Sequence, residues 1–308
     1  MKNDAPYTLV LTHDVDHLFI RHMPFFSKTA GSFIKRCMFS NLARWLKKDL
    51  TFREYLRSFF TGLLFPLIKI GMIPDPWEKS LDLILGIEKK YDVRSTFYFI
   101  PFYRTQGFID DHTPAPERRG TDYDVRELRN KLEYLEENGW EVGIHGINAH
   151  LSVDKAAEEL AVFKTMLPGK QKWGLRIHWL YQPPELWENL RNAGYNYDAT
   201  FGSNDDVGFM EEKYHPFEKS GLAVLPLNIQ DGSLLAHWHQ SLTMDQAWER
   251  VKEILETARK HKAVVTILWH NVSFTYPRCW QNLYTRIIEQ GKADGARFMT
   301  AIEAVENR

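Results

Sequence analysis

The chain has 308 residues, of which 44% are hydrophobic and 26% charged, and its formal net charge is −1. This composition is typical of a folded globular protein rather than a disordered chain, and the near-zero charge argues against a general affinity for nucleic acids. The two cysteines, Cys37 and Cys279, belong to no CxxC or Cys/His pattern, so we expect free thiols and no disulfide scaffold.

The sequence pattern predicts neither an export signal nor a membrane-spanning helix. The N-terminal residues lack a basic stretch followed by an apolar one, and a strand-like segment begins by Tyr7. The longest apolar stretch, 59–73, is broken by glycine, proline and polar residues and is shorter than the roughly 20 residues that cross a bilayer. We therefore expect a cytoplasmic protein.

Short apolar segments alternate with amphipathic helical patterns along most of the chain. The expected strands are 7–11, 94–100, 141–144, 173–177, 197–200, 223–228, 264–269 and 297–299. The expected helices are 76–90, 125–138, 153–166, 184–193 and 244–261. This alternation predicts βαβ units, and hence an α/β fold with a parallel sheet that closes or nearly closes into one barrel domain over residues 1–308.

Residues 18–73 interrupt this alternation, because they are far longer than an ordinary connection between a strand and a helix. Apolar residues recur at helical spacing in 33–46 and again in 52–63, with Lys and Arg between them. From His17 to Ile73 there are ten Lys or Arg against only Asp49 and Glu54, so this stretch carries about +8 and the rest of the chain about −9. Two interpretations stay open: a helical cap packed on the barrel, or a basic amphipathic element that faces a membrane surface or an acidic polymer.

The most informative motif is Thr12-His13-Asp14-Val15-Asp16-His17, which directly follows the first expected strand. It brings two carboxylates, spaced i and i+2, to a strand end, where catalytic groups collect in parallel α/β folds. Because nearby like charges disfavour double ionisation, a divalent cation is the expected means of holding both carboxylates together. The motif therefore predicts a metal-hydrolase site.

Further reactive side chains follow other strands. His145 and His150 come after the third strand, and two imidazoles with one Asp form a ligand set suited to Zn, Co, Ni or Fe. Arg176 ends the fourth strand, where it is suited either to orient a carboxylate base or to form a structural ion pair. His270 ends the last long strand, and Asp231 is available to hold its tautomer, as a general acid requires.

Several aromatic side chains near these strand ends are candidates for contact with a substrate, because aromatic faces pack against sugar rings, although plain core packing is equally open to them. The expected substrate contacts are Trp179, Tyr181, His178, Trp238 and Trp269.

With these motifs in this order, the chain resembles the polysaccharide deacetylases of the NodB-homology, carbohydrate esterase 4 type, over its whole length except residues 18–73. The motif around Asp14 has one residue more than the TFDDG usual in that family, and the gap from His145 to His150 is also one residue longer. Arg176 matches the start of the family's third motif, and 267–270 match its last. The resemblance implies a distorted (β/α)7, TIM-like barrel with a helical insertion after strand 1.

The resemblance also implies roles for these residues. Asp14 would be the catalytic base, and a divalent metal, zinc before cobalt or nickel, would be held by Asp16, His145 and His150. His270 would protonate the departing amine, with its pKa tuned by Asp231.

The expected function is therefore metal-dependent removal of an N-acetyl group from a glycan or a glycan precursor, including a lipid- or nucleotide-linked sugar. Two alternatives are an amidase of small non-sugar amides and a glycan-binding protein whose catalytic site has decayed. The expected partner is a carbohydrate rather than a nucleic acid. Residues 18–73 add an expected peripheral contact with the inner face of the membrane, and the oligomeric state stays open.

Overall fold

The computed structural model describes residues 5–110, 112–115 and 120–307. Within these residues ten strands form one sheet, in the order β6-β7-β5-β4-β3-β2-β1-β9-β8, with β10 paired to the first half of β1. All neighbours are parallel except β6 and β7. The strands are β1 (Thr8–Val15), β2 (Thr96–Phe99), β3 (Glu141–Gly146), β4 (Gly174–Ile177), β5 (Tyr197–Asp198), β6 (Phe217–Lys219), β7 (Leu222–Val224), β8 (Ile229–Gln230), β9 (Val264–Leu268) and β10 (Arg297–Met299).

The sheet curls into a distorted barrel, and the chain between β7 and β8 bridges its two sides. The Leu225 N–H donates to the Asp198 carbonyl (2.8 Å), and three residues later the Asn228 N–H donates to the Thr266 carbonyl (3.0 Å). The Asn228 side chain in turn accepts from the Thr266 N–H (2.8 Å). One extended segment thus pairs first with β5 and then with β9, and the expected barrel is confirmed.

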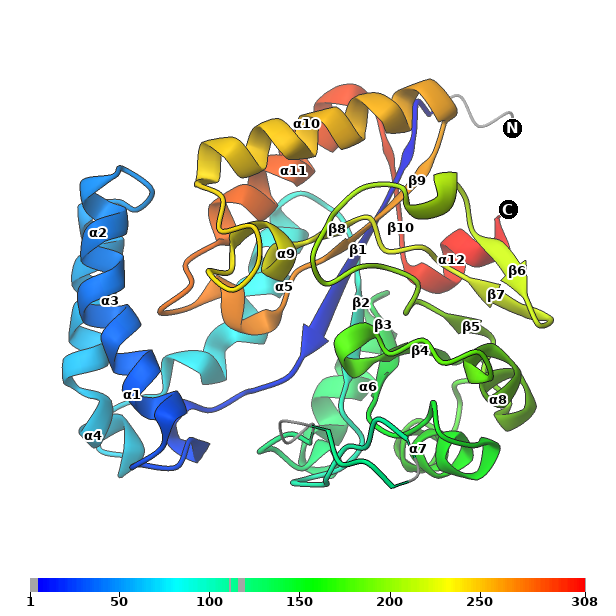
Figure 1. The fold of residues 1–308 in the computed structure, drawn as a ribbon, viewed down its shortest axis with the longest axis horizontal. Helices are drawn as coiled ribbons and strands as arrows, with labels where there is room; N and C mark the ends of the chain where they lie inside the picture. Colours follow the sequence, from blue (N-terminus) through cyan, green and yellow to red (C-terminus); the bar gives the residue numbers. More distant parts are fainter. Residues whose placement is uncertain (1–4, 111, 116–119, 308) are drawn as a thin grey trace.

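Helices cover the outside of this barrel (Figure 1). They are α5 (Ser80–Lys90), α6 (Arg129–Glu137), α7 (Val153–Met166), α8 (Leu186–Ala193), α9 (Asp231–Leu235), α10 (Met244–His261), α11 (Gln281–Asp294) and α12 (Ala301–Glu306), with the short turns η3 (Pro76–Lys79), η4 (Val125–Leu128), η5 (His178–Leu180), η6 (Met210–Glu212) and η7 (Asn271–Phe274). The five expected helices are confirmed, whereas α9, α11 and α12 were not predicted. In α11 the poor helix former Gly291 is required for packing, because a Cβ there would lie 2.4 Å from Leu9 of β1.

The first strand is longer than its apolar run suggests. Residues Thr12–Val15 pair with Thr96–Phe99, so β1 continues through most of the motif that was expected to follow it. Side chains alternate along a strand. Leu11 and Val15 accordingly pack in the outer core, whereas Val10 packs in the interior cluster with Tyr98 and Tyr197. Asp14 shares the inward direction of Val10, so the strand itself aims its carboxylate into the barrel.

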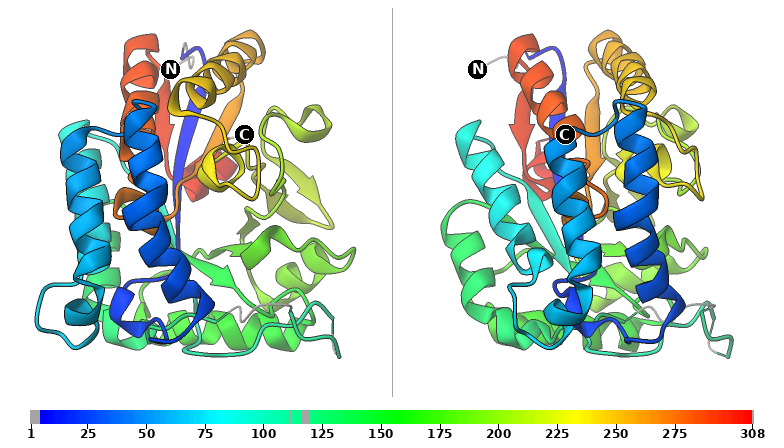
Figure 2. Two further views of the ribbon diagram at one scale, coloured as in Figure 1. Left: turned by 60° about the vertical axis from the view of Figure 1, so that its left-hand side comes forward. Right: turned by 90° about the vertical axis from the view of Figure 1, so that its left-hand side faces the viewer.

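Residues 18–73, here called the insertion lobe, form helices beside the barrel (Figures 1 and 2). These are η1 (Ile20–His22), α1 (Lys28–Lys35), the π-helical η2 (Arg36–Ser40), α2 (Asn41–Leu46), α3 (Phe52–Leu63) and α4 (Phe65–Lys69). The lobe rests on the chain before α11: the Asn41 amide donates to the Pro277 carbonyl (2.8 Å), and the Arg44 guanidinium donates to the Arg278 carbonyl (2.7 Å). Among the described residues, no helix combines the length and the apolar character needed to cross a bilayer.

Candidate metal and acid–base site

Side chains from β1, β3 and the end of β4 meet at the carboxyl end of the barrel. Asp14 and Asp16 lie two residues apart at the end of β1, and His145 of β3 is in register with Arg176 of β4. His178 directly follows the end of β4 and comes two residues after Arg176, the same spacing as that of the two aspartates at the end of β1. Parallel strands place these ends at one edge of the sheet, and this brings the five side chains together.

Asp16, His145 and His178 form a group whose ligand atoms all lie within 4.8 Å of one another. Asp16 Oδ1 lies 3.4 Å from His145 Nε2 and 3.8 Å from His178 Nε2. His145 Nδ1 lies 2.9 Å from the Arg176 carbonyl, which can only accept, so Nδ1 is the donor there and Nε2 is the nitrogen directed to Asp16.

The donor chemistry of this group fits a divalent cation. Asp16 Oδ1 and His145 Nε2 are both buried, and neither has a hydrogen-bond partner within the described part of the chain. Burial by itself would raise the pKa of Asp16, but the adjacent His178, His145 and His270 imidazoles hold that pKa well below its usual value. An anionic oxygen and two imidazole nitrogens are ligands that zinc and similar cations accept.

His150, the expected third ligand, is not part of this group, and His178 stands there instead. His150 Nε2 lies 3.3 Å from the Ile109 carbonyl, and its ring stacks on Tyr181 with centroids 5.9 Å apart. It lies in the turn after β3, where strand alternation no longer fixes the direction of a side chain. The two-residue spacing from Arg176, carried one residue past the end of β4, was the available signal for His178, which was expected to contact the substrate instead.

Arg176 is fully buried and holds Asp14 in place. One nitrogen, Nη1, donates to Asp14 Oδ1 (2.9 Å) and to Thr12 Oγ1 (2.9 Å), while Nε donates to the Ala199 carbonyl (3.0 Å). The other carboxylate oxygen of Asp14, Oδ2, then lies 3.6 Å from His145 Nε2. The guanidinium thus occupies one oxygen of Asp14 and leaves the other facing the metal group.

His270 and Asp231 form a second charged pair at the same edge. His270 Nδ1 lies 2.6 Å from Asp231 Oδ1, and the His270 backbone N–H donates to Oδ2 (3.0 Å), which also accepts from the Ser273 hydroxyl. Burial would lower the pKa of His270, but the Asp231 carboxylate raises it to about 9. His270 Nε2 lies 3.7 Å from Asp16 Oδ2, so a protonated Nε2 faces the metal group.

The remaining histidine of the first strand has a structural role. His13 points to the outer side of β1, where Nδ1 lies 2.7 Å from the Trp269 carbonyl and Nε2 lies 2.9 Å from Glu88 Oε1. Both contacts are fully buried. His13 therefore anchors β1 to β9 and α5 and takes no part in the site.

Of the expected substrate contacts, Trp179 and Trp238 are about half exposed, whereas Trp269 is 0% exposed and packs on Tyr284. Trp269 is thus a core residue, and its prediction as a substrate contact is wrong. Left-handed backbone at Trp179 (φ 65°) turns the chain sharply after His178 and leaves the indole in solvent. Trp238 lies beneath the Arg36 guanidinium of the insertion lobe, 4.9 Å from the ring centre.

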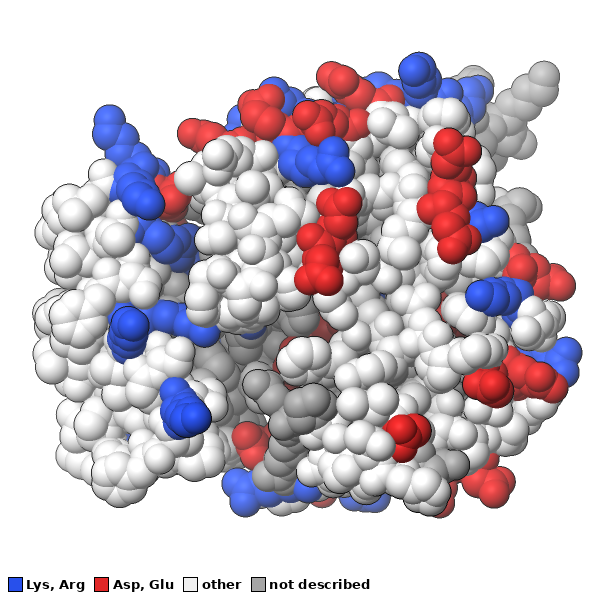
Figure 3. Space-filling model, in the orientation of Figure 1, with Lys and Arg blue, Asp and Glu red and all other residues white. Residues whose placement is uncertain are grey.

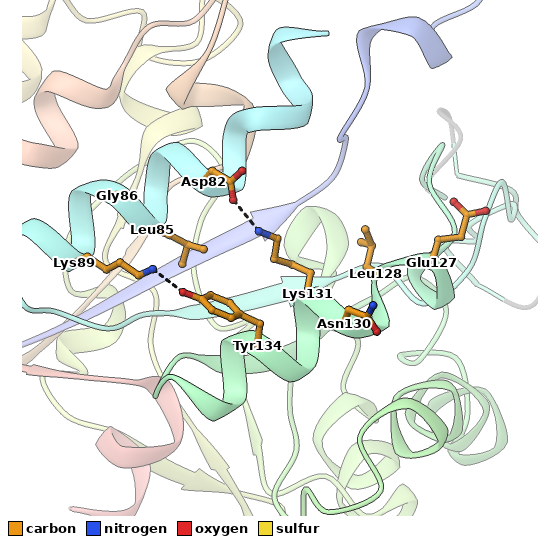
Figure 4. A pocket seen from close by; sticks show the side chains of 9 residues that line it. All are labelled: Asp82, Leu85, Gly86, Lys89, Glu127, Leu128, Asn130, Lys131 and Tyr134. Carbon is orange, nitrogen blue, oxygen red and sulfur yellow. Dashed lines mark hydrogen bonds and ion pairs between the residues drawn. The ribbon is translucent and has the colours of Figure 1, made fainter. Parts of the chain in front are cut away.

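A separate groove of about 580 Å³ lies on the outside of the barrel between α5 and α6 (Figure 4). Its walls are joined by the ion pair of Lys131 with Asp82 (2.7 Å) and by the hydrogen bond from Lys89 to the Tyr134 hydroxyl (2.6 Å). None of the residues that line it belongs to the metal group or to the acid–base pairs. The candidate metal and acid–base residues therefore lie at the strand ends, apart from this groove.

No family model and no curated protein matches the sequence. Solved structures do match it. A protein assigned as a polysaccharide deacetylase from Mycobacterium smegmatis aligns over 100% of this chain and 91% of its own, with 14% identity and a TM-score of 0.58. The PuuE allantoinase aligns over 99% of this chain and 91% of its own, with 11% identity and a TM-score of 0.57.

A third structure, assigned as a polysaccharide deacetylase from Pseudomonas aeruginosa PAO1, covers 98% of this chain and 91% of its own, with 10% identity and a TM-score of 0.55. At such identities the likeness concerns the fold rather than the reaction. The order of the strands, the inward aspartate of β1 and these alignments lead to one conclusion: the chain has the distorted barrel fold of the polysaccharide deacetylases.

Proposed function

We propose that this protein is a metal-dependent hydrolase that removes an N-acetyl group from a glycan or a glycan precursor. The observation that carries the proposal is the placement of a buried carboxylate, Asp14, and a protonated imidazole, His270, around one metal-ligand group. Amide hydrolysis needs a base for the attacking water and an acid for the departing nitrogen.

The cation would be held by Asp16, His145 and His178, and zinc is our first choice, with cobalt or nickel as alternatives. When bound, such a cation supplies Lewis acidity, which polarises an acyl carbonyl and lowers the pKa of a water molecule.

The chain's own residues supply the proton transfers. Asp14 Oδ2, free of the Arg176 contact, is the oxygen that accepts a proton from the attacking water. Asp231 holds the Nδ1 proton of His270, so the proton on Nε2 is the one donated to the amine nitrogen. With a pKa of about 9, His270 carries that proton at neutral pH.

The two exposed indoles favour a sugar as substrate, because Trp179 and Trp238 offer aromatic faces near the carboxyl edge of the barrel. A second candidate follows from the likeness to an allantoinase, namely hydrolysis of a small cyclic amide by the same base and acid. The intact Asp14–Arg176 and His270–Asp231 pairs argue against a decayed binding site.

The proposal is tested by acetate release from a panel of N-acetylated sugars, including nucleotide-linked and lipid-linked ones, with zinc, cobalt or nickel added to the protein. Ring opening of allantoin, which releases no acetate, is followed in parallel by its consumption. We expect acetate from at least one sugar, loss of turnover on chelation and recovery with metal. Turnover of allantoin alone would favour the second candidate. Sugar binding without any turnover, in protein shown to contain metal, would overturn both enzyme functions.

A further inference from the structure

The outer surface of the insertion lobe is unusually apolar. The lobe holds less than a fifth of the chain, yet it carries ten of the fifteen large apolar side chains that are exposed among the described residues. The ten are Phe25, Phe26, Phe39, Leu46, Phe52, Leu56, Phe60, Leu63, Ile70 and Met72. Large exposed apolar surfaces on a folded protein mark sites of interaction.

A helix that packs on a protein core usually buries its apolar side. Helix α3 instead exposes its apolar side. Its buried face is small and polar: Ser58 is 0% exposed and donates to the Cys37 carbonyl, and a Cβ at Gly62 would lie 2.8 Å from Cys37 Cβ. Its apolar face looks outward. Phe52, Phe60 and Leu63 are 51–53% exposed, and Leu56 between them is also exposed.

Residues spaced by three and four positions share one side of a helix. Phe52, Leu56, Phe60 and Leu63 therefore form a continuous apolar stripe along α3. In the right-hand view of Figure 2 the helices of the lobe lie in front of the barrel, so their outer sides have no neighbour within the described chain. The lobe is thus a cap on its inner side and an unpartnered apolar surface on its outer side.

The lobe also carries exposed cations. Six Lys or Arg side chains of the lobe are exposed, and none of the six forms an ion pair with a carboxylate in the described residues: Lys28, Lys35, Lys47, Lys48, Arg53 and Arg57. Figure 3 shows Lys and Arg scattered among uncharged residues over the lobe, whereas Asp and Glu lie mostly over the barrel. Apolar side chains flanked by Lys and Arg are the pattern of helices that lie in the interface of an anionic bilayer.

We propose that the outer face of α2 and α3 docks on an anionic membrane surface. The charge decides between occupants. A second copy would bring the same cationic lobe against the first, and since residues 17–73 carry about +8 in each copy, this pairing is repulsive. A nucleic acid would satisfy the cations but offers no apolar interior for Leu56 and Leu63. A bilayer with acidic headgroups satisfies both.

The test is flotation of the full chain with vesicles of phosphatidylcholine alone or mixed with phosphatidylglycerol, at low and high salt. We expect binding to the mixed vesicles only, weakened by salt. The triple variant Phe52→Ser, Phe60→Ser, Leu63→Ser is expected to lower the partition coefficient by about tenfold or more. The pair Lys47→Glu and Lys48→Glu is expected to lower it by about fivefold per residue or more.

Matched controls come from exposed positions outside the lobe. The double variant Leu83→Ser, Met210→Ser removes exposed apolar side chains and is the control for the triple variant. The double variant Lys164→Glu, Lys260→Glu reverses the same number of charges as the Lys47, Lys48 pair. Neither control should alter vesicle binding. Equal binding to neutral vesicles, or binding that the lobe variants leave unchanged, would overturn the proposal. The proposal would also be overturned if the protein showed no vesicle binding and instead formed a lipid-free dimer in sedimentation that the triple variant dissociates. Because binding is measured without turnover, failure of the proposed deacetylase reaction would leave this result intact.

Discussion

His178 Nε2 lies 3.8 Å from Asp16 Oδ1, on the side of that carboxylate where His145 Nε2 also lies. The contact joins the end of β4 to the end of β1. It makes His178 the third member of the group with Asp16 and His145, a place for which the sequence predicted His150. Its first consequence concerns metal affinity.

We expect His178→Ala to weaken zinc binding by about a hundredfold or more. Removing a residue that only hydrogen-bonds to a metal ligand already lowers metal affinity by about ten- to hundredfold. His150→Ala is the matched control and should bind zinc as the parent does, since His150 contacts the Ile109 carbonyl and Tyr181 instead. Isothermal titration of metal-stripped protein measures both constants. The reverse order of effects would restore His150 as the ligand.

The example of His178 shows how far the sequence determines the site. Wherever a functional residue lay on a strand, as Asp14, His145 and Arg176 do, composition and alternation sufficed to predict its place. His150 lies beyond the end of β3, where the turn from Asn148 to Leu151 sets its direction. The alternation of side chains along β3 does not extend into that turn.

Other features escaped prediction because they depend on packing across the fold. Trp269 is buried because it packs against Tyr284 on α11. The sequence pattern did not predict α11, which contains the poor helix former Gly291. The outward apolar face of α3 has the same periodicity as an inward one. Only the position of Ser58 and Gly62 against η2 reveals which way it points.

The buried pair of Asp14 with Arg176 yields a prediction on stability. Arg176→Met leaves the Asp14 carboxylate buried without its cation, and we expect the free energy of unfolding to fall by about 3–5 kcal/mol. The double variant Asp14→Asn, Arg176→Met should lose clearly less, because no charge is then left unpaired. Urea unfolding of metal-free protein measures both losses. Equal losses in the single and double variants would mean that the pair contributes little.

A substitution of Asp14 should separate metal binding from turnover. Asp14→Asn keeps the shape of the side chain but removes its basicity, so we expect zinc affinity to stay close to that of the parent while turnover falls by about 10²- to 10⁴-fold. Asp16→Asn is the comparison, because it should lose both. Metal content after dialysis and acetate release are measured on the same samples, and full activity in Asp14→Asn would remove it from the base role.

Packing inside the barrel depends on Gly174, which lies opposite the Tyr197 ring. A Cβ at this glycine would come within 1.9 Å of Tyr197 Cζ, and the ring is held by hydrogen bonds to Tyr98 (3.1 Å) and Glu141 (2.7 Å). Gly174→Ala should therefore lower the free energy of unfolding by about 1–3 kcal/mol. Gly169→Ala, which meets nothing within 4 Å, is the matched control and should change it little. Comparable losses from both would show that the ring moves aside easily.

The pH dependence of turnover should report the His270–Asp231 pair. A general acid works below its pKa, so the activity should fall on the alkaline side as His270 loses its proton, from a pKa that is about 9 in the metal-free protein. A bound cation adds positive charge and moves this limb downward. In Asp231→Asn the carboxylate that raises the pKa of His270 most is gone, so that pKa falls. We therefore expect the alkaline limb of kcat/KM to shift to lower pH in Asp231→Asn relative to the parent with the same metal. An unchanged limb would show that another group donates the proton, and His270→Gln would then be expected to retain turnover.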